Sequence, residues 1–242
     1  MAYRQKLIIC GKKAELYQYE VPIATGKRKK ARQTIRRRTK EEVMAEVKRN
    51  ENSAFEMEVM RDFSLRRTRA RITRLIDSNS DLKVFMTLTF KENIKELKEA
   101  NVFFKKFILR LKYLYKGLKY LAVPEFQKRG AVHYHVLINF EMSHDKMQEI
   151  WGQGFVMINR VKHVNNLGMY ISKYVGKDLF DIRYFGMRKI LSSKNLEQPI
   201  IITVFQEVKE FMLTAIGNIK PVFEKLYRSD WLGQIHYRMY TP

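Results

Sequence analysis

The stretch "LKYLAVPEFQKRGAVHYHVLINF", residues 118–140, predicts two antiparallel strands joined by a tight turn. Residues 118–127 and 131–140 are rich in β-branched and aromatic side chains, which favour strands. The intervening "KRG" is a turn sequence, because glycine accepts backbone conformations that other residues avoid. This hairpin is the centre of the predicted fold.

Side chains alternate between the two faces of a strand, so the second strand has an apolar face and a histidine face. The apolar face is expected to pack against helices and consists of Val132, Tyr134, Val136 and Ile138. His133 and His135 share the other face, about 7 Å apart at their roots, which allows both imidazoles to reach one ion. The alternative is that both are ordinary half-buried polar residues.

The first strand of the hairpin supplies an oxygen ligand opposite these histidines. Glu125 is the expected third ligand, because a carboxylate neutralises part of the charge of a divalent cation. Gln127, on the same face, is the alternative, since an amide oxygen also binds hard cations. The site predicted here would keep coordination positions open for phosphate oxygens.

The flanking hydrophobic patterns place the hairpin in a domain with the order β-α-β-β-α-β-α. The other expected elements are a strand at 84–90, a helix at 93–115, a helix at 144–154, a strand at 155–161 and a helix at 166–180. This order predicts an α+β fold of the ferredoxin-like or RRM-like type, with an antiparallel sheet and helices packed on one face.

The rest of the chain is expected to form extensions of this domain. Residues 1–55 are predicted to be a basic extension that contains a small hairpin around Gly11. Residues 56–205 would form the main domain, beginning with an arginine-rich helix at 56–77. Residues 206–242 are predicted to be a helical extension that packs on it.

The charge of the chain indicates a polyanionic partner. Lys and Arg number 47 against 25 Asp and Glu, a formal net charge of +22, and nucleic acid is the first candidate. A ribosomal protein, a phosphate-binding enzyme or a membrane-surface protein would also fit. The single cysteine, Cys10, excludes an intrachain disulfide and a cysteine-based zinc cluster. No apolar run is long enough for a membrane span.

A second informative stretch is "MYISKYVGKD", residues 169–178. In a helix its polar members fall within about 100° of one another and form one face: Tyr170, Lys173, Tyr174 and Lys177. Lysines are suitable phosphate partners, and a phenol attacks phosphorus when a metal polarises the phosphate. The alternative is an amphipathic helix with a solvated Tyr and Lys flank.

Three ordered motifs resemble those of the HUH endonucleases, and more narrowly the rolling-circle replication initiator (Rep) proteins of plasmids and phages. They are "FMTLTF" at 85–90, "EFQKRGAVHYHVLINF" at 125–140 and "YISKYVGKD" at 170–178. The resemblance implies that His133, His135 and an acidic or polar third ligand hold Mg²⁺ or Mn²⁺. It also implies that a tyrosine nicks single-stranded DNA, forming a 5′-phosphotyrosine and releasing a 3′-hydroxyl.

The same resemblance proposes two tyrosines as nucleophiles, Tyr170 and Tyr174, with Lys173 positioning the phosphate. Some family members use a residue that matches Tyr170, and one plasmid branch uses a residue that matches Tyr174, so the first nucleophile is left open. Two alternating nucleophiles would let one tyrosine hold an old end while the other cuts the regenerated origin.

The expected substrate is single-stranded or hairpin origin DNA, and basic residues are the candidates for binding it. They are Arg66, Arg67, Arg69, Arg71, Arg74, Lys128, Arg129 and Lys177. No G-x-x-x-x-G-K-[ST] sequence is present, so unwinding would depend on a host helicase, with a host polymerase extending the 3′-hydroxyl. Neither a membrane nor a small-molecule cofactor is expected, and the predicted location is the cytoplasm of a bacterial host.

Two alternative functions remain open from the sequence. An HUH transposase or a mobilisation relaxase shares the same chemistry. A non-catalytic nucleic-acid-binding protein would explain the charge and the fold, but such modules use exposed aromatics on the sheet. Here the expected open face carries Thr, Glu, Gln and His instead.

Overall fold

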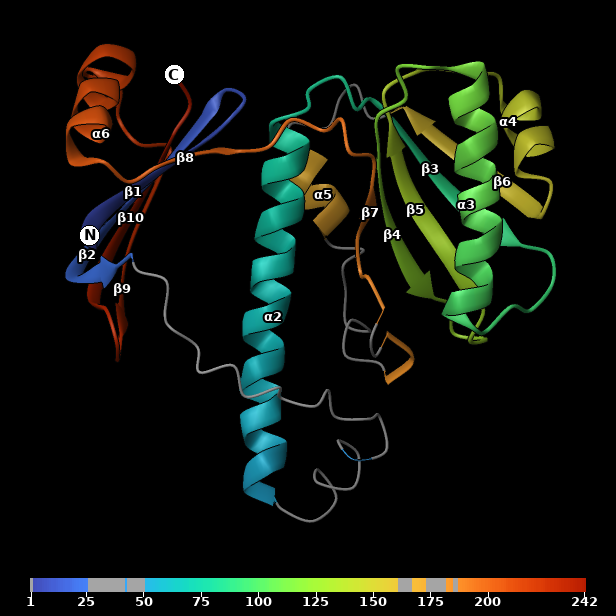
Figure 1. Ribbon diagram of the computed structural model, residues 1–242, viewed down its shortest axis with the longest axis horizontal. Helices are drawn as coiled ribbons and strands as arrows, with labels where there is room; N and C mark the ends of the chain where they lie inside the picture. The colour runs from blue at the N-terminus through green and yellow to red at the C-terminus, as the bar shows by residue number, and fades with distance from the viewer. Residues whose placement is uncertain (1, 26–41, 43–50, 161–166, 173–181, 185–186) are drawn as a thin grey trace. The chain divides into compact units, whose positions relative to one another are not determined.

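A computed structural model describes most of the chain (Figure 1). The described residues are 2–25, 42, 51–160, 167–172, 182–184 and 187–242. The chain divides into two compact units, one made of Arg38–Leu196 and the other of Met1–Arg37 with Glu197–Pro242. Each unit has its own sheet and its own core.

The larger unit is built on a five-stranded antiparallel sheet with the order β6-β3-β5-β4-β7. Its strands are β3 (Val84–Phe90), β4 (Tyr120–Phe126), β5 (Val132–Ile138), β6 (Gly154–Arg160) and β7 (Leu191–Ser192). The order of the first four strands is that of a ferredoxin-like sheet. The prediction of an α+β fold with an antiparallel sheet is therefore confirmed.

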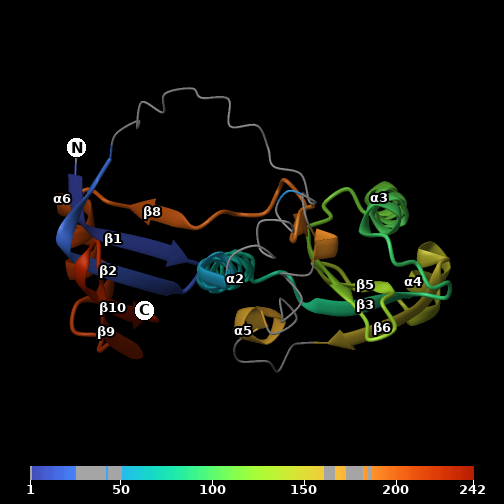
Figure 2. The same cartoon turned by 90° about the horizontal axis from the view of Figure 1, so that it is seen from below.

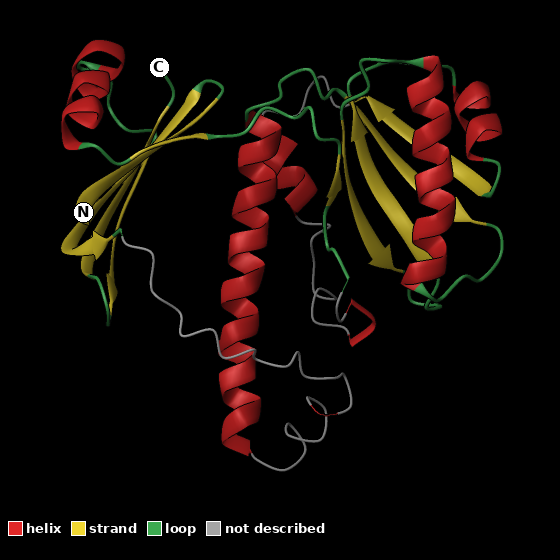
Figure 3. Ribbon diagram, in the orientation of Figure 1, coloured by secondary structure: helices red, strands yellow, loops and turns green. Residues whose placement is uncertain are grey.

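One face of this sheet packs against helices α3 (Leu97–Leu114) and α4 (His144–Trp151), as Figure 3 shows. The apolar side chains predicted for β5 are all in this core, where the ring of Tyr134 stacks on that of Phe104 at 4.4 Å. Alternation along β5 thus predicts the buried face correctly.

The opposite face also receives helices, α2 (Glu51–Asp77) and α5 (Leu167–Ser172) (Figure 2). Ile72 and Leu75 of α2 pack there on Phe85 of β3 and Leu137 of β5. The expectation of helices on one face only is therefore corrected. The histidine face carries these apolar side chains as well, and burying them requires a cover.

Helix α5 lies against α2 at a glycine. A Cβ atom on Gly168 would stand 2.9 Å from both Cα and Cγ2 of Thr73, closer than such atoms approach. Glycine at this position therefore permits the close contact between the two helices, and that contact sets where the neighbouring Tyr170 lies.

The smaller unit has a second five-stranded sheet, with the order β8-β1-β2-β10-β9. Its strands are β1 (Ala2–Cys10), β2 (Lys13–Ala24), β8 (Ile200–Ile202), β9 (Phe223–Ser229) and β10 (Gly233–Tyr240). Helix α6 (Phe205–Phe211) and the π-helical turn η3 (Met212–Ile216) pack on it. The hairpin predicted around Gly11 is confirmed as β1 and β2.

The expected helical extension at 206–242 requires correction. The helical part ends at Gly217, and Phe223–Ser229 and Gly233–Tyr240 form a hairpin. Strand β10 pairs with β2, so both ends of the chain share one sheet instead of forming two separate extensions. Among the described residues, no helix combines the length and apolar character needed to cross a membrane.

Candidate metal centre

Three potential metal ligands converge on neighbouring strands of the larger unit. In the β4–β5 register Glu125 lies opposite His133, and His135 follows two residues later on the same face. Oε2 of Glu125 accepts hydrogen bonds from Nε2 of His133 at 3.0 Å and from Nε2 of His135 at 2.5 Å. The potential ligand atoms of the three residues all lie within 4.8 Å of one another.

The surroundings of the triad favour the protonation states that bind metal. Burial alone would raise the pKa of Glu125, but its hydrogen bonds to His133 and His135 and their charge outweigh burial and lower the pKa to about 2. Burial lowers the pKa of His135, and the charge of His133 adds to this effect. An ionised carboxylate next to a neutral imidazole is the form a cation requires.

Two neighbours on β3 hold the imidazole of His135 in place. The hydroxyl of Thr87 lies 3.2 Å from its Nδ1, and the ring of Phe85 stacks on it with centroids 5.7 Å apart. A threonine hydroxyl both donates and accepts, so the Thr87 contact persists whichever ring nitrogen carries the proton. The contact leaves Nε2 directed toward Glu125, where an ion would bind.

The donor set suits a divalent cation with open coordination positions. Imidazole nitrogens and a carboxylate oxygen together suit Mn²⁺ and related ions, and carboxylates also bind Mg²⁺. The side chain of His135 is buried, whereas those of His133 and Glu125 are 15% and 31% exposed. Three protein ligands with one exposed side leave room for substrate oxygens.

Tyr170 lies on the same side of the sheet as the triad. It is half-buried on α5, and its ring packs edge-on against Phe85 with centroids 5.9 Å apart. Phe85 thus contacts both Tyr170 and His135. Tyr174, Lys173 and Lys177 lie outside the described residues.

The alternative ligand Gln127 belongs to the turn after β4. Its Oε1 accepts a hydrogen bond from Nε of Arg129 at 2.9 Å, and Nη2 of Arg129 donates to the carbonyl of Phe90 at 3.1 Å. Arg129 therefore attaches the turn to the end of β3. Lys128, also a predicted DNA-binding residue, is exposed.

The five predicted arginines of α2 occupy different surroundings. Arg66, Arg67 and Arg71 are exposed, whereas Arg69 and Arg74 are half-buried. Their spacing along one helix directs them to different sides of it.

Three contributors to the site region are not singled out by the sequence. Thr87 is expected there only to line the floor, and it contacts His135 directly. Tyr184 donates to the carbonyl of Pro124 at 2.9 Å, and the guanidinium of Arg183 lies 3.7 Å from the ring centroid of Phe126. Both brace β4 beside Glu125. No local pattern announces a contact between residues about sixty positions apart.

Comparison with known families agrees with this placement. Residues 83–179 match a family model described as a replication-associated protein of the ORF2 type. The matched segment begins before β3, includes the whole triad and extends through α5. It confirms the predicted resemblance to replication proteins. No curated protein and no solved structure shows significant similarity to the chain.

Proposed function

From a chain whose residues 83–179 match the replication-associated protein family, we propose a rolling-circle replication initiator that nicks and rejoins single-stranded DNA at an origin. The observation that carries the proposal is the convergence of His133, His135 and Glu125 on one point of an antiparallel sheet, beside a helix that bears Tyr170. Such an arrangement suits transfer of a phosphoryl group.

In this proposal His133, His135 and Glu125 hold Mg²⁺ or Mn²⁺, while Thr87 orients the ring of His135. When bound, the ion supplies Lewis-acid activation of a phosphodiester. The phenolic oxygen of Tyr170 attacks phosphorus and loses its proton. The bond from phosphorus to the 3′-oxygen breaks, and that oxygen gains a proton as the free 3′-hydroxyl.

The product is a tyrosine ester of the 5′-phosphate, which keeps the phosphodiester energy and lets a later 3′-hydroxyl reverse the step. Tyr174 is proposed as the second nucleophile, and Lys173 and Lys177 as phosphate-positioning residues. A host helicase and polymerase in a bacterial cytoplasm are the proposed partners, since nicking alone neither unwinds nor copies DNA.

Other members of the same reaction class would differ in their DNA partner. A transposase or a mobilisation relaxase would form the same covalent adduct on a different sequence. A non-catalytic binding protein would form none, and the experiment below separates it from the enzymes.

The test is a covalent-adduct assay. The protein is incubated with Mn²⁺ and labelled single-stranded DNA from its own origin region, then analysed on a denaturing gel. We expect an adduct that EDTA abolishes and that the double change His133→Ala and His135→Ala removes. His144→Ala, at an exposed histidine outside the triad, is the matched control and should retain the adduct.

A metal-independent adduct, or full adduct formation by the double histidine variant, would overturn the metal assignment. Comparing Tyr170→Phe, Tyr174→Phe and the double variant assigns the nucleophiles. If neither tyrosine change reduces the adduct, the proposed nucleophiles are wrong.

A further inference from the structure

The larger unit has a cleft of about 670 Å³ that is separate from the metal triad. One wall is formed by α2 and the other by the segment at 188–192, which includes β7. The residues that line it are Ser64, Arg67, Thr68, Arg71, Arg188, Lys189, Ile190 and Ser192.

The lining of this cleft is strongly basic. Four of these eight side chains are cationic, three carry hydroxyls and one is apolar, and none of the eight is a carboxylate. Guanidinium groups bind phosphate oxygens through two parallel hydrogen bonds. The hydroxyl of Thr68 donates to the carbonyl of Ser64, so Ser64 and Ser192 are the hydroxyl donors of interest.

Helical geometry explains which arginines of α2 reach the cleft. Ser64, Arg67, Thr68 and Arg71 follow the spacing i, i+3, i+4 and i+7, which forms one stripe along a helix. Arg66 points about 150° away from the centre of that stripe at 100° per residue. The five arginines that are equivalent in the sequence are therefore separated into two that line the cleft and three that do not.

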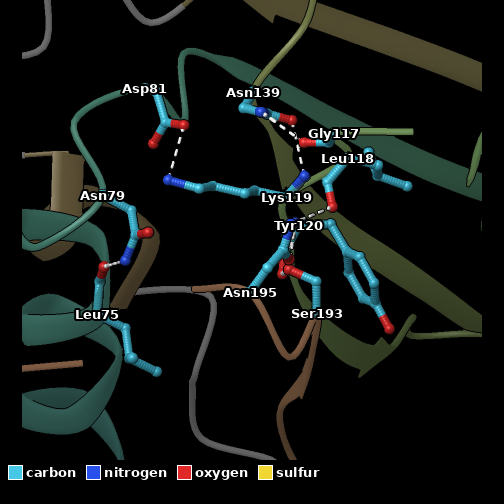
Figure 4. Close-up of polar contacts among 10 residues, drawn as sticks. All are labelled: Leu75, Asn79, Asp81, Gly117, Leu118, Lys119, Tyr120, Asn139, Ser193 and Asn195. Atoms are coloured by element: carbon cyan, nitrogen blue, oxygen red, sulfur yellow. Dashed lines mark hydrogen bonds and ion pairs between the residues drawn. The ribbon is translucent and has the colours of Figure 1, made fainter. Parts of the chain in front are cut away.

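Both walls are attached to the folded core. The segment that follows β7 is joined to β4 by reciprocal hydrogen bonds between Ser193 and Tyr120 and by a 3.2 Å bond from Nδ2 of Asn195 to the carbonyl of Leu118 (Figure 4). On the other wall, Ile72 directly follows Arg71 and is fully buried against the sheet. The cationic side chains thus project from backbone that is held in place.

The cleft lies on the same side of the sheet as the triad. Ser192 pairs with Leu121 on β4, and Glu125 follows four residues later on the same strand and face. Four residues of strand span about 13 Å, comparable to about four phosphates at the 3.4 Å spacing of a stacked strand. One DNA strand is therefore long enough to occupy both places at once.

We propose that this cleft binds the phosphate backbone of the DNA strand a few nucleotides from the scissile phosphate, with Arg67, Arg71 and Arg188 as its main contacts. The proposal rests on the proposed function. The volume exceeds what a single phosphate needs, and the sequence-wide charge of +22 favours a polyanion. A lipid surface would call for exposed apolar side chains, and the lining offers only Ile190.

The test measures how binding of labelled oligothymidine depends on salt, by fluorescence anisotropy without divalent metal. Each phosphate contact on a single strand contributes about 0.7 to the slope of log K against log salt. Removing Arg67, Arg71 and Arg188 as alanines should lower the slope by about 2. Replacing Lys98, Lys105 and Lys112, exposed on α3 at the other face of the sheet, removes the same charge and should change it little.

A second comparison uses neighbouring residues of one helix. Arg67→Ala should lower the slope by about 0.7, whereas Arg66→Ala should leave it unchanged. Equal effects of the two, or equal effects of the two triple variants, would overturn the proposal in favour of a general charge effect. If the triple cleft variant does not fold, Arg188→Ala, at an exposed position outside the helices, gives the same reading alone.

Failure of this proposal and failure of the proposed function have different signatures. An unchanged slope in a protein whose wild type forms the metal-dependent adduct would reject the cleft alone. A lowered slope in a protein whose wild type forms no adduct would keep the cleft and reject the nicking chemistry.

Discussion

At the scale of single residues, the Glu125 carboxylate connects the two imidazoles. One oxygen atom, Oε2, accepts from both His133 and His135, so without an ion two protons occupy the space where an ion would bind. Metal binding must displace these protons, and the triad should therefore release protons when it takes up Mn²⁺.

The pKa of Glu125 leads to a prediction about acid stability. Since folding lowers this pKa from 4.5 to about 2, the carboxylate stabilises the metal-free fold above pH 4.5, and that contribution is lost as the pH falls toward 2. Glu125→Gln should reduce the dependence of the urea midpoint on pH between 4.5 and 2. Urea titrations at several pH values check this. Parallel curves for the two proteins would contradict it.

The contact between Thr87 and His135 gives a second prediction. Thr87→Val removes the hydroxyl that orients the ring, and outer partners of this kind are worth about 10- to 100-fold in metal affinity. Isothermal titration with Mn²⁺ should show a loss in that range. Thr89→Val, on the same strand and face, is the control and should have a much smaller effect. Equal losses would show that only strand stability matters.

At the scale of elements, the close contact of α5 and α2 determines where Tyr170 lies. Gly168→Ala would bring a Cβ within 2.9 Å of backbone and side-chain atoms of Thr73, so α5 must shift. We expect a loss of about 1–3 kcal/mol in the free energy of unfolding. Adduct formation should fall, while Mn²⁺ affinity, which depends on β4 and β5, should change little.

Gly117→Ala is the control for this change, because a Cβ there would meet its nearest atom at an ordinary 3.6 Å. Thermal unfolding and metal titration of both variants check the prediction. A Gly168→Ala protein with unaltered stability would show that the helices separate without cost.

Elements are predicted well where the signal is local. The strand predicted at 84–90 has its observed ends, and the β4–β5 hairpin brings Glu125 opposite His133 as alternation requires. The prediction of helix for the segment that forms β9 is wrong. It is an edge strand whose side chains are almost all exposed, so burial leaves little alternating pattern in its sequence.

At the scale of the whole molecule, the chain ends cooperate in one unit. Tyr240 of β10 is buried with Leu7 and Leu16 of the N-terminal hairpin and with Val208 of α6. The smaller unit therefore cannot form until both ends of the chain are present.

This arrangement predicts that core damage in one unit spares the site in the other. Tyr240→Ala should destabilise the smaller unit by about 3–5 kcal/mol, since it removes a large buried ring. Mn²⁺ affinity of the triad should be retained. Hydrogen exchange measured unit by unit, with the 88% exposed Tyr113→Ala as the control, checks this. Equal loss of protection in both units would contradict it.

The sequence by itself determined the period-2 alternation of β5, the turn before it and hence the pairing of Glu125 with two histidines, because these depend on neighbours within one hairpin. Only the tertiary structure decided that α2 covers the second face, that Arg67 and Arg71 meet Arg188, and that the two chain ends share a sheet. Those contacts join segments far apart in the chain. They are selected by the burial of complementary surfaces, which no local pattern encodes.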